Sequence, residues 1–169
     1  PEDKVRRMKE RLMEDFYLTQ DIIDIYMEEY PEGNVWDIDP AALRQMGFIS
    51  HRKYVIRDRF GSARDFFEKL FAENETLDLR DHSEYAVCSM FSAVWLGLAR
   101  DFKVVEIEPG VFLNSQYLEK HGITQEAIHE FCENVYHFME NGKCFSIKSL
   151  QAAGFVLPWQ EEGWGDWFY

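Results

Sequence analysis

The side chains best suited to chemistry in this sequence form a basic segment, residues 50–64. The segment holds five Lys or Arg and one Asp, a net charge of +4, whereas the 169-residue chain carries a net charge of −13. Clustered cations can bind phosphates, and arginine can also read guanine edges through paired hydrogen bonds. The candidate nucleic-acid-binding residues are His51, Arg52, Lys53, Arg57, Arg59 and Arg64.

The role of this segment depends on whether residues 48–60 form a helix or a strand. A helix capped by Ser50 would project the cations into solvent, as a DNA-reading helix does. A strand would alternate its side chains between two faces and place some of them in a sheet. The structural alternative is a basic edge paired with acidic neighbours, such as residues 28–32 or the pair Glu161 and Glu162. Because the chain is acidic overall, we favour this structural role.

A second candidate is a ladder of metal-binding residue types between positions 126 and 137. His129, Glu133 and His137 recur every four residues and would share one face of a helix, with Glu126 and Glu130 beside them. The spacing is not the His-Glu-x-x-His pattern of metalloproteases, and no second helix repeats the carboxylate–histidine pair. A solvated polar face explains the same residues, so we expect no metal and no other cofactor.

Tryptophans gather near the C-terminal end of the sequence. Trp159, Trp164 and Trp167 could form a patch that binds a partner protein, because aromatic side chains dominate many such contacts. Alternatively they belong to a closing helix, because Asp166-Trp167-Phe168 resembles the order Asp65-Phe66-Phe67. We favour the structural interpretation and keep partner binding as the functional one.

The motifs of the common enzyme classes are missing from the sequence. It has no phosphate-binding P-loop, no dinucleotide-binding glycine pattern and no nucleophile elbow. Cys132 and His129 would face different sides of one helix. The three cysteines, at positions 88, 132 and 144, are an odd number without Cys-x-x-Cys spacing, which favours reduced thiols in a reducing compartment. We therefore expect a cytoplasmic protein that is not an enzyme.

Hydrophobic periodicity and helix caps predict a chain of mostly helical elements. Thr19, Asp39 and Ser62 are the expected N-caps. Short strands are expected at 35–38 and 144–145, and a hairpin is expected at 103–107 and 111–113 around a Pro-Gly turn. Helices are expected at residues 3–17, 21–30, 40–46, 63–72, 83–100, 115–121, 125–140 and 147–153.

Three of the short helices share one sequence pattern, Leu-x-x-x-Gly-apolar. Chance would supply this pattern about 0.3 times in a chain of this composition. The leucine would hold the helix to the core, the glycine would leave it in a left-handed conformation, and the apolar residue would pack back. The three copies are Leu43/Gly47/Phe48, Leu118/Gly122/Ile123 and Leu150/Gly154/Phe155.

The order of amphipathic helix, short strand, short helix and glycine turn resembles tandem winged-helix units of the helix-turn-helix type. The resemblance covers residues 19–72 and 83–140, with a truncated third copy from residue 124. It implies that strand 35–37 and helix 39–46 precede a recognition-type helix and a wing. The second copy departs from the pattern because its hairpin precedes its short helix, and no clear wing follows the long helix of the third. The alternative is an irregular helical domain in which glycines simply end helices.

The composition is that of a folded acidic chain. Hydrophobic residues make up 46% and aromatic residues 16% of it, which excludes a disordered chain. No apolar run is long enough to span a membrane and no signal peptide is recognisable, so we expect no membrane contact. Because the sequence starts at Pro1 and stops within the aromatic residues 167–169, we expect it to be a piece of a longer polypeptide.

These features predict a mainly α fold with short β-hairpins (α+β), built from two to three winged-helix-like units packed into one compact body. Residues 1–75 would hold the N-terminal helix and the first unit, and residues 76–169 the second unit and a truncated third. The predicted function is a non-enzymatic regulatory or scaffolding module of a larger intracellular protein, which contacts a partner protein or the remaining part of its own chain. The alternative is a transcription-regulator-type DNA-binding domain that uses residues 51–64.

Overall fold

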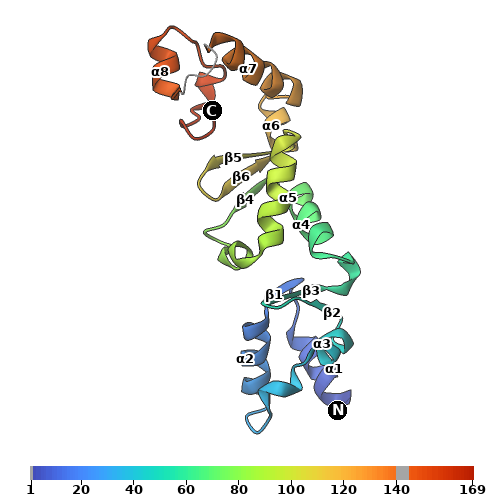
Figure 1. Ribbon diagram of the computed structural model, residues 1–169. Helices are drawn as coiled ribbons and strands as arrows, with labels where there is room; N and C mark the ends of the chain where they lie inside the picture. The colour runs from blue at the N-terminus through green and yellow to red at the C-terminus, as the bar shows by residue number, and fades with distance from the viewer. Residues whose placement is uncertain (1, 140–144) are drawn as a thin grey trace. The chain divides into compact units, whose positions relative to one another are not determined.

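The computed structural model describes residues 2–139 and 145–169 as a mixed α+β chain (Figure 1). The chain divides into two compact units. Unit 1 holds residues 1–70 and 82–94, and unit 2 holds residues 71–81 and 95–169. The predicted α+β class is confirmed at this level, while the domain division between residues 75 and 76 stays a prediction.

Unit 1 is built on a three-stranded antiparallel sheet in the order β1-β3-β2. Its register pairs Phe16 of β1 and Ile49 of β2 with the same residue of β3, Ile56. Helices α1, α2 and α3 gather on one face of this sheet (Figure 1). The elements that begin in this unit are α1 (Glu2–Arg11), β1 (Phe16–Leu18), α2 (Thr19–Glu29), the 3-10 turn η1 (Val35–Asp37), α3 (Pro40–Gln45), β2 (Phe48–Ser50), β3 (Tyr54–Arg57), η2 (Asp58–Phe60), α4 (Ala63–Glu73), η3 (Ser83–Val87) and α5 (Ser89–Arg100).

Both faces of this sheet are covered. Val55 lies in the core under α1, α2 and α3, and Ile56, which points the other way, is also fully buried. Each such side chain stabilises the fold by roughly 1.5–3 kcal/mol. The core under the three helices consists of Met8, Leu12, Ile22, Tyr26, Ile38, Leu43, Met46, Phe48 and Val55. A second, aromatic cluster joins Phe16, Phe66, Phe67, Tyr85 and Phe91, with ring centroids 5.0–6.2 Å apart.

Unit 2 carries a second antiparallel sheet in the corresponding order, β4-β6-β5. Gly110 turns the β5–β6 hairpin with a φ of 79°, in the left-handed region that favours glycine. The buried side chain of Asn114 donates to the carbonyl of Phe71 (3.1 Å) and accepts from the N–H of Tyr117 (3.0 Å), which ties the sheet to α6. One core cluster of this unit consists of Leu113, Leu118, Ile123 and Ile128. The elements that begin here are β4 (Thr76–Asp78), β5 (Val104–Glu108), β6 (Val111–Asn114), α6 (Ser115–Lys120), α7 (Gln125–Phe138), α8 (Ile147–Ala152) and η4 (Gln160–Glu162).

The three Leu-x-x-x-Gly segments form the same local structure. Each is a six-residue helix whose N-cap side chain, that of Asp39, Asn114 or Ser146, accepts a hydrogen bond from a backbone N–H of the first turn. In every copy the leucine is buried and the glycine has a φ between 73° and 94°. Ile123 and Phe155 donate to the carbonyl of the leucine five residues earlier, which is the Schellman pattern, whereas the first copy continues into β2. The predicted short helices ended by glycine are confirmed.

The first predicted helix, residues 3–17, is wrong in its extent because it ends at Arg11. Residues 16–18 form β1 instead and pair with β3. Glu14 and Asp15 would also place two carboxylates at the negative end of a longer helix, which is unfavourable. Tertiary pairing therefore replaced the last turn and a half of the predicted helix.

The helix predicted over residues 83–100 is two helices separated at Cys88, whose backbone is extended. In an unbroken helix Tyr85 and Phe91, six residues apart, would point in directions about 120° apart. The break lets both rings enter the aromatic cluster, where their centroids are 6.1 Å apart. Thr19, a predicted N-cap, is instead the first residue of α2.

Two predicted strands and a predicted closing helix also need correction. Residues 35–37 form the 3-10 turn η1, because Asn34 and Asp37 form a reciprocal capping box. Phe145 lies outside any strand, while Cys144 is outside the described residues. Residues 166–168 form a turn rather than the start of a helix.

Candidate functional site

The basic segment is a strand and a turn rather than a helix. Residues 48–57 form the β2–β3 hairpin, with the turn at residues 51–53. Val55 and Ile56 explain the strand, because both are β-branched and both are fully buried. The DNA-reading helix considered after Ser50 is therefore absent, and the strand alternative is the one observed.

Three arginines of this segment have partners within unit 1. The Arg57 guanidinium lies 4.1 Å from the centre of the Phe48 ring and donates to the carbonyls of Leu12 and Met46. Arg59 pairs with Asp15 at 2.5 Å. Arg64 lies 3.6 Å from Glu68, one helical turn along α4. Arg57 in particular holds the end of α1 and α3 to the sheet, which is a structural role.

The turn of the hairpin carries the remaining cations. His51 stacks on Tyr54 with centroids 4.6 Å apart, and burial lowers the pKa of its imidazole. Arg52 and Lys53 are exposed and form no ion pair with any described residue. Glu28 and Glu29, considered as partners for the basic segment, pair with Arg7 and Arg11 of α1 instead.

The three candidate tryptophans of unit 2 differ in their surroundings. Trp159 and Trp164 pack against the core, and the Trp164 ring stacks on Phe168 with centroids 4.8 Å apart. Trp167 is 57% exposed. The structure therefore does not bring the three side chains together as one exposed patch, and Trp167 alone of the three is mainly in solvent.

The His/Glu ladder lies on α7 as its spacing indicated. Glu133 is 3.9 Å from the Nε2 atom of His129 and 3.6 Å from that of His137. All three side chains are exposed. Among residues 2–139 and 145–169, no group of three or more His, Cys, Asp or Glu side chains is arranged to hold a metal ion. These contacts are those of a solvated helix face.

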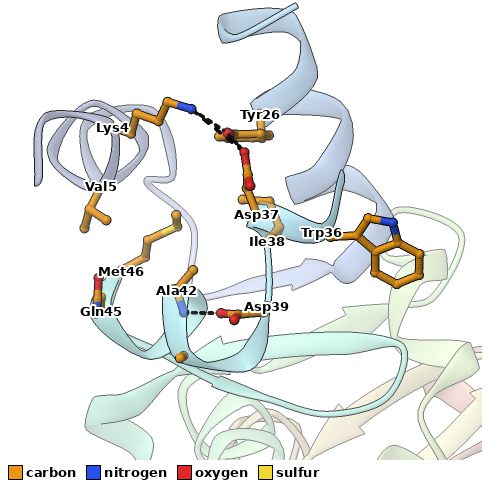
Figure 2. Close-up of a pocket in the computed structure, with 11 residues that line it drawn as sticks. Lys4, Val5, Tyr26, Trp36, Asp37, Ile38, Asp39, Ala42, Gln45 and Met46 are labelled. Carbon is orange, nitrogen blue, oxygen red and sulfur yellow. Dashed lines mark hydrogen bonds and ion pairs between the residues drawn. The ribbon is translucent and has the colours of Figure 1, made fainter. Parts of the chain in front are cut away.

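Unit 1 contains an open cleft of about 510 Å³ among α1, α2, η1 and α3 (Figure 2). Its volume is in the range of small-ligand and peptide side-chain sites. Lys4 of α1, Tyr26 of α2 and Asp37 of η1 meet in the upper part of the view, and apolar side chains such as Val5, Ile38 and Met46 lie below them (Figure 2). The lining residues are Lys4, Val5, Tyr26, Trp36, Asp37, Ile38, Asp39, Ala41, Ala42, Gln45 and Met46.

A chain of polar contacts crosses the cleft from α1 to η1. The Lys4 Nζ atom donates to the Tyr26 hydroxyl at 2.9 Å, and that hydroxyl donates to Asp37 Oδ2 at 2.6 Å. The Lys4 ammonium also lies 5.0 Å from the centre of the Tyr30 ring. Gly33 makes room for this arrangement, because a Cβ there would lie 2.8 Å from a ring carbon of Tyr26.

These contacts reinforce the ordinary protonation states of all three groups. The hydrogen bond to Tyr26 raises the pKa of Lys4, and burial together with the hydrogen bond to Asp37 raises the pKa of Tyr26. The hydrogen bond from Tyr26 lowers the pKa of Asp37. A general acid or base works best with a pKa near the working pH, and all three shifts lead away from neutrality. The contact chain is therefore built to hold elements together.

Trp36 is the exposed aromatic side chain of this cleft. Trp36 is 83% exposed, although the backbone of its turn is held by two hydrogen bonds. The Trp36 N–H donates to the Asn34 side chain at 3.0 Å, and the Asn34 N–H donates to Asp37 at 3.2 Å. A large aromatic group on a fixed backbone loses little freedom when a partner covers it.

The local sequence does not mark this cleft. Val35 and Trp36 fit the strand predicted over residues 35–38, in which alternate residues enter a core. The Asn34-x-x-Asp37 capping box was the available signal, because it indicates a helical turn at these positions. The contacts of Lys4 with Tyr26 and Asp37 join residues far apart in sequence and have no local signature.

Comparison of the chain with protein-family models, curated proteins and solved structures gives no match. Within the part of the chain that the structure describes, no helix combines the length and apolar character needed to cross a membrane.

Proposed function

We propose that this chain is a non-enzymatic module that binds another polypeptide through the cleft of unit 1. Such a module would serve a regulatory or scaffolding role in a larger intracellular protein. The observation that carries the proposal is Trp36, an exposed side chain on a capped turn beside an open cleft. Tryptophan is the residue type most enriched among the side chains that dominate protein interfaces.

The chemistry of the cleft supports binding over catalysis. Lys4, Tyr26 and Asp37 are engaged with one another, and their pKa shifts hold them in their ordinary protonation states. The cleft also has an apolar part, from Val5, Ile38 and Met46, that can receive an aliphatic or aromatic side chain. This combination suits recognition of a peptide segment.

The order of elements supports a winged-helix-like assignment for two successive segments of the chain, residues 2–57 and 63–114, of which the second draws residues from both units. The first segment runs helix, strand, two helices and two strands, as α1, β1, α2, α3, β2 and β3. In its sheet the first strand pairs with the third and the third with the second. The same order recurs as α4, β4, η3 with α5, β5 and β6. In this assignment the β2–β3 hairpin is the wing of the first unit, and α3 takes the place of the recognition helix.

Selection of peptide ligands tests the protein-binding proposal. The full chain is immobilised and exposed to a display library of random peptides of about twelve residues, a length that crosses a typical recognition groove. Trp36→Ala is expected to lower the affinity for the selected peptides by at least about tenfold, because truncation of a central interface tryptophan commonly has that effect. Trp167→Ala is the matched control, since it removes an exposed tryptophan from unit 2. Peptides that bind the wild type and Trp36→Ala equally would contradict the proposal.

DNA binding is a second candidate function, favoured by Arg52 and Lys53 at the tip of the β2–β3 hairpin. Both side chains are exposed and neither is neutralised by a described residue. The test is a mobility shift of double-stranded DNA at low salt, with the double variant Arg52→Glu/Lys53→Glu. Loss of a wild-type shift in that variant would support this function, and absence of a wild-type shift would exclude it. Arg57 is left unchanged because its contacts hold unit 1 together.

A further inference from the structure

We infer that the cleft of unit 1 takes a polypeptide segment in which an arginine stands next to an apolar side chain. This inference rests on the proposed function and adds the chemistry of the partner. Three features of unit 1 carry it: two carboxylates within four residues of Trp36 in the chain that have no cationic partner among the described residues, the exposed Trp36 side chain, and the apolar lining of the cleft.

The charges around Trp36 are not balanced within unit 1. Residues 28–39 hold five carboxylates and no Lys or Arg. Glu28 and Glu29 pair with arginines of α1, and Asp37 lies 3.9 Å from Lys4. Glu32 and Asp39 have no cationic partner among the described residues. Two negative charges therefore remain on either side of Trp36 in the chain, and they favour a cation in the partner.

Asp39 is well placed to accept that cation. Its Oδ1 atom accepts the N–H of Ala42 at 2.7 Å, which fixes the carboxylate at the start of α3 (Figure 2). Its Oδ2 atom accepts no hydrogen bond from any described residue. A carboxylate that is already positioned loses little freedom when it pairs, so an incoming donor gains a charge-assisted hydrogen bond at small entropic cost.

The exposed indole selects arginine over lysine. A guanidinium is planar, stacks on an aromatic face and is more weakly hydrated than an ammonium. It can therefore lie on Trp36 and donate to a nearby carboxylate at the same time. A lysine could satisfy only one of these contacts well. Phosphate groups and other anions are disfavoured because the two unpaired groups near Trp36 are carboxylates.

The apolar part of the cleft accounts for the apolar residue that stands next to the arginine in the proposed segment. Val5, Ile38, Ala42 and Met46 also line the cleft, below the Lys4–Tyr26–Asp37 contacts in Figure 2. Methionine adapts its shape to irregular neighbours, which suits a site that receives an aliphatic or aromatic side chain. An arginine beside such a residue would place its guanidinium at Asp39 while its neighbour enters the cleft.

The closing experiment uses the peptides that the display selection yields and that depend on Trp36. Each arginine is replaced by citrulline, which keeps the shape and removes the charge. The double variant Glu32→Gln/Asp39→Asn removes the two unpaired carboxylates, and asparagine retains the helix-capping oxygen. Asp101→Asn/Glu119→Gln makes the same charge change in unit 2 and is the matched control.

The expected result is a loss of about tenfold in affinity for the citrulline peptides and a similar loss for Glu32→Gln/Asp39→Asn, with little further loss when both changes are combined. Non-additivity of this kind shows that the arginine and the carboxylates interact. The control variant should bind as the wild type does. Trp36-dependent peptides that lack arginine, or that bind the double variant normally, would overturn the inference and leave the proposed function standing. Absence of any Trp36-dependent peptide would overturn both.

Discussion

Unit 1 and unit 2 have the same strand order and the same capped six-residue helix, yet they use charge and tryptophan differently. Unit 1 carries 12 Lys and Arg against 16 Asp and Glu, and unit 2 carries 6 against 15. In unit 1 several of the basic side chains pair with acidic ones, and the one tryptophan, Trp36, is exposed. In unit 2 Trp159 and Trp164 are part of the packing.

The difference between the units distinguishes residues that stabilise the fold from residues that form the candidate binding site. Features that both units share, such as the buried leucine and the left-handed glycine of the short helix, determine how the chain turns and packs. Features found in one unit alone, such as the capped turn under Trp36, are those that a partner could recognise. The following experiments test that separation, beginning with the largest expected effect.

Removal of the shared leucine should destabilise both units strongly. Leu43→Ala and Leu118→Ala each empty a fully buried position and should lower the free energy of unfolding by about 2–5 kcal/mol. Chemical denaturation measures the change. Leu96→Ala is the control, because that leucine is 53% exposed and its loss should alter stability by no more than about 0.5 kcal/mol. Equal effects at all three positions would refute the shared-scaffold interpretation.

Removal of Trp164 should destabilise the protein, whereas removal of Trp36 should not. Trp164→Ala removes a ring that packs on the core and stacks on Phe168, and it should cost about 2 kcal/mol of stability, less than a fully buried tryptophan. Trp36→Ala should change stability by less than about 0.5 kcal/mol because its indole is in solvent. Thermal and denaturant unfolding provide the measurements. A marked destabilisation by Trp36→Ala would mean that this indole is structural and not free for a partner.

The left-handed glycines should respond alike in both units. Gly47→Ala and Gly122→Ala should each cost about 1–2 kcal/mol, because an L residue is strained at φ values of 88° and 73° even where space is available. Gly97 lies within helix α5 with nothing near its absent Cβ. Gly97→Ala should therefore stabilise by about 0.5–1 kcal/mol. If the two positive-φ substitutions also stabilised the protein, strain at the shared turn would not be the reason for these glycines.

The smallest expected effect concerns the Lys4–Tyr26–Asp37 contacts, which the described residues of unit 2 do not repeat. The pKa of Asp37 is lowered in the folded chain, so its contribution to stability is present above its ordinary value of 3.8 and is lost as the pH falls below it. Tyr26→Phe removes the main cause of that shift. The difference in unfolding free energy between neutral pH and about pH 3 should therefore be smaller in Tyr26→Phe than in the wild type.

Asp101→Asn, which changes an exposed carboxylate of unit 2, serves as the control for the acid measurement. An unchanged pH dependence in Tyr26→Phe would show that the hydrogen bond from Tyr26 does not set the acid response of unit 1. The measurement is independent of any ligand and so tests the cleft as a structural feature alone.

Short-range features of the fold were predictable because their causes are local. Asp39 and Ser62 were predicted as caps, and each accepts a backbone N–H at the expected position. The β5–β6 hairpin follows from Pro109-Gly110, because the turn needs a residue at positive φ. The predicted helices are wrong where contacts with distant residues oppose the local preference. At residues 16–18, pairing with β3 gives a strand in place of helix. At Cys88, packing of the aromatic cluster interrupts the helix predicted over residues 83–100.

The candidate site was less predictable than the fold. The basic segment was found from charge alone, but the sequence pattern left open whether it was helix or strand. Packing makes the segment a strand, because Val55 and Ile56 are buried on opposite faces of one sheet. Arg57 was grouped with the nucleic-acid candidates because its charge is visible in sequence, whereas its contacts with Phe48 and with two carbonyls are visible only in the fold.

The sequence by itself determined the short capped helices, the glycine turns, the hairpin after α5 and the acidic character of the chain. Each depends on side chains within a few positions of one another, so local hydrogen bonds and backbone preferences suffice. The tertiary structure alone decided that Trp36 faces solvent, that Lys4 meets Tyr26 and Asp37, and that Glu32 and Asp39 lack a cationic partner among the described residues. Those outcomes depend on which distant helix packs against which strand, and so the cleft and its predicted arginine-bearing partner emerge only from the folded chain.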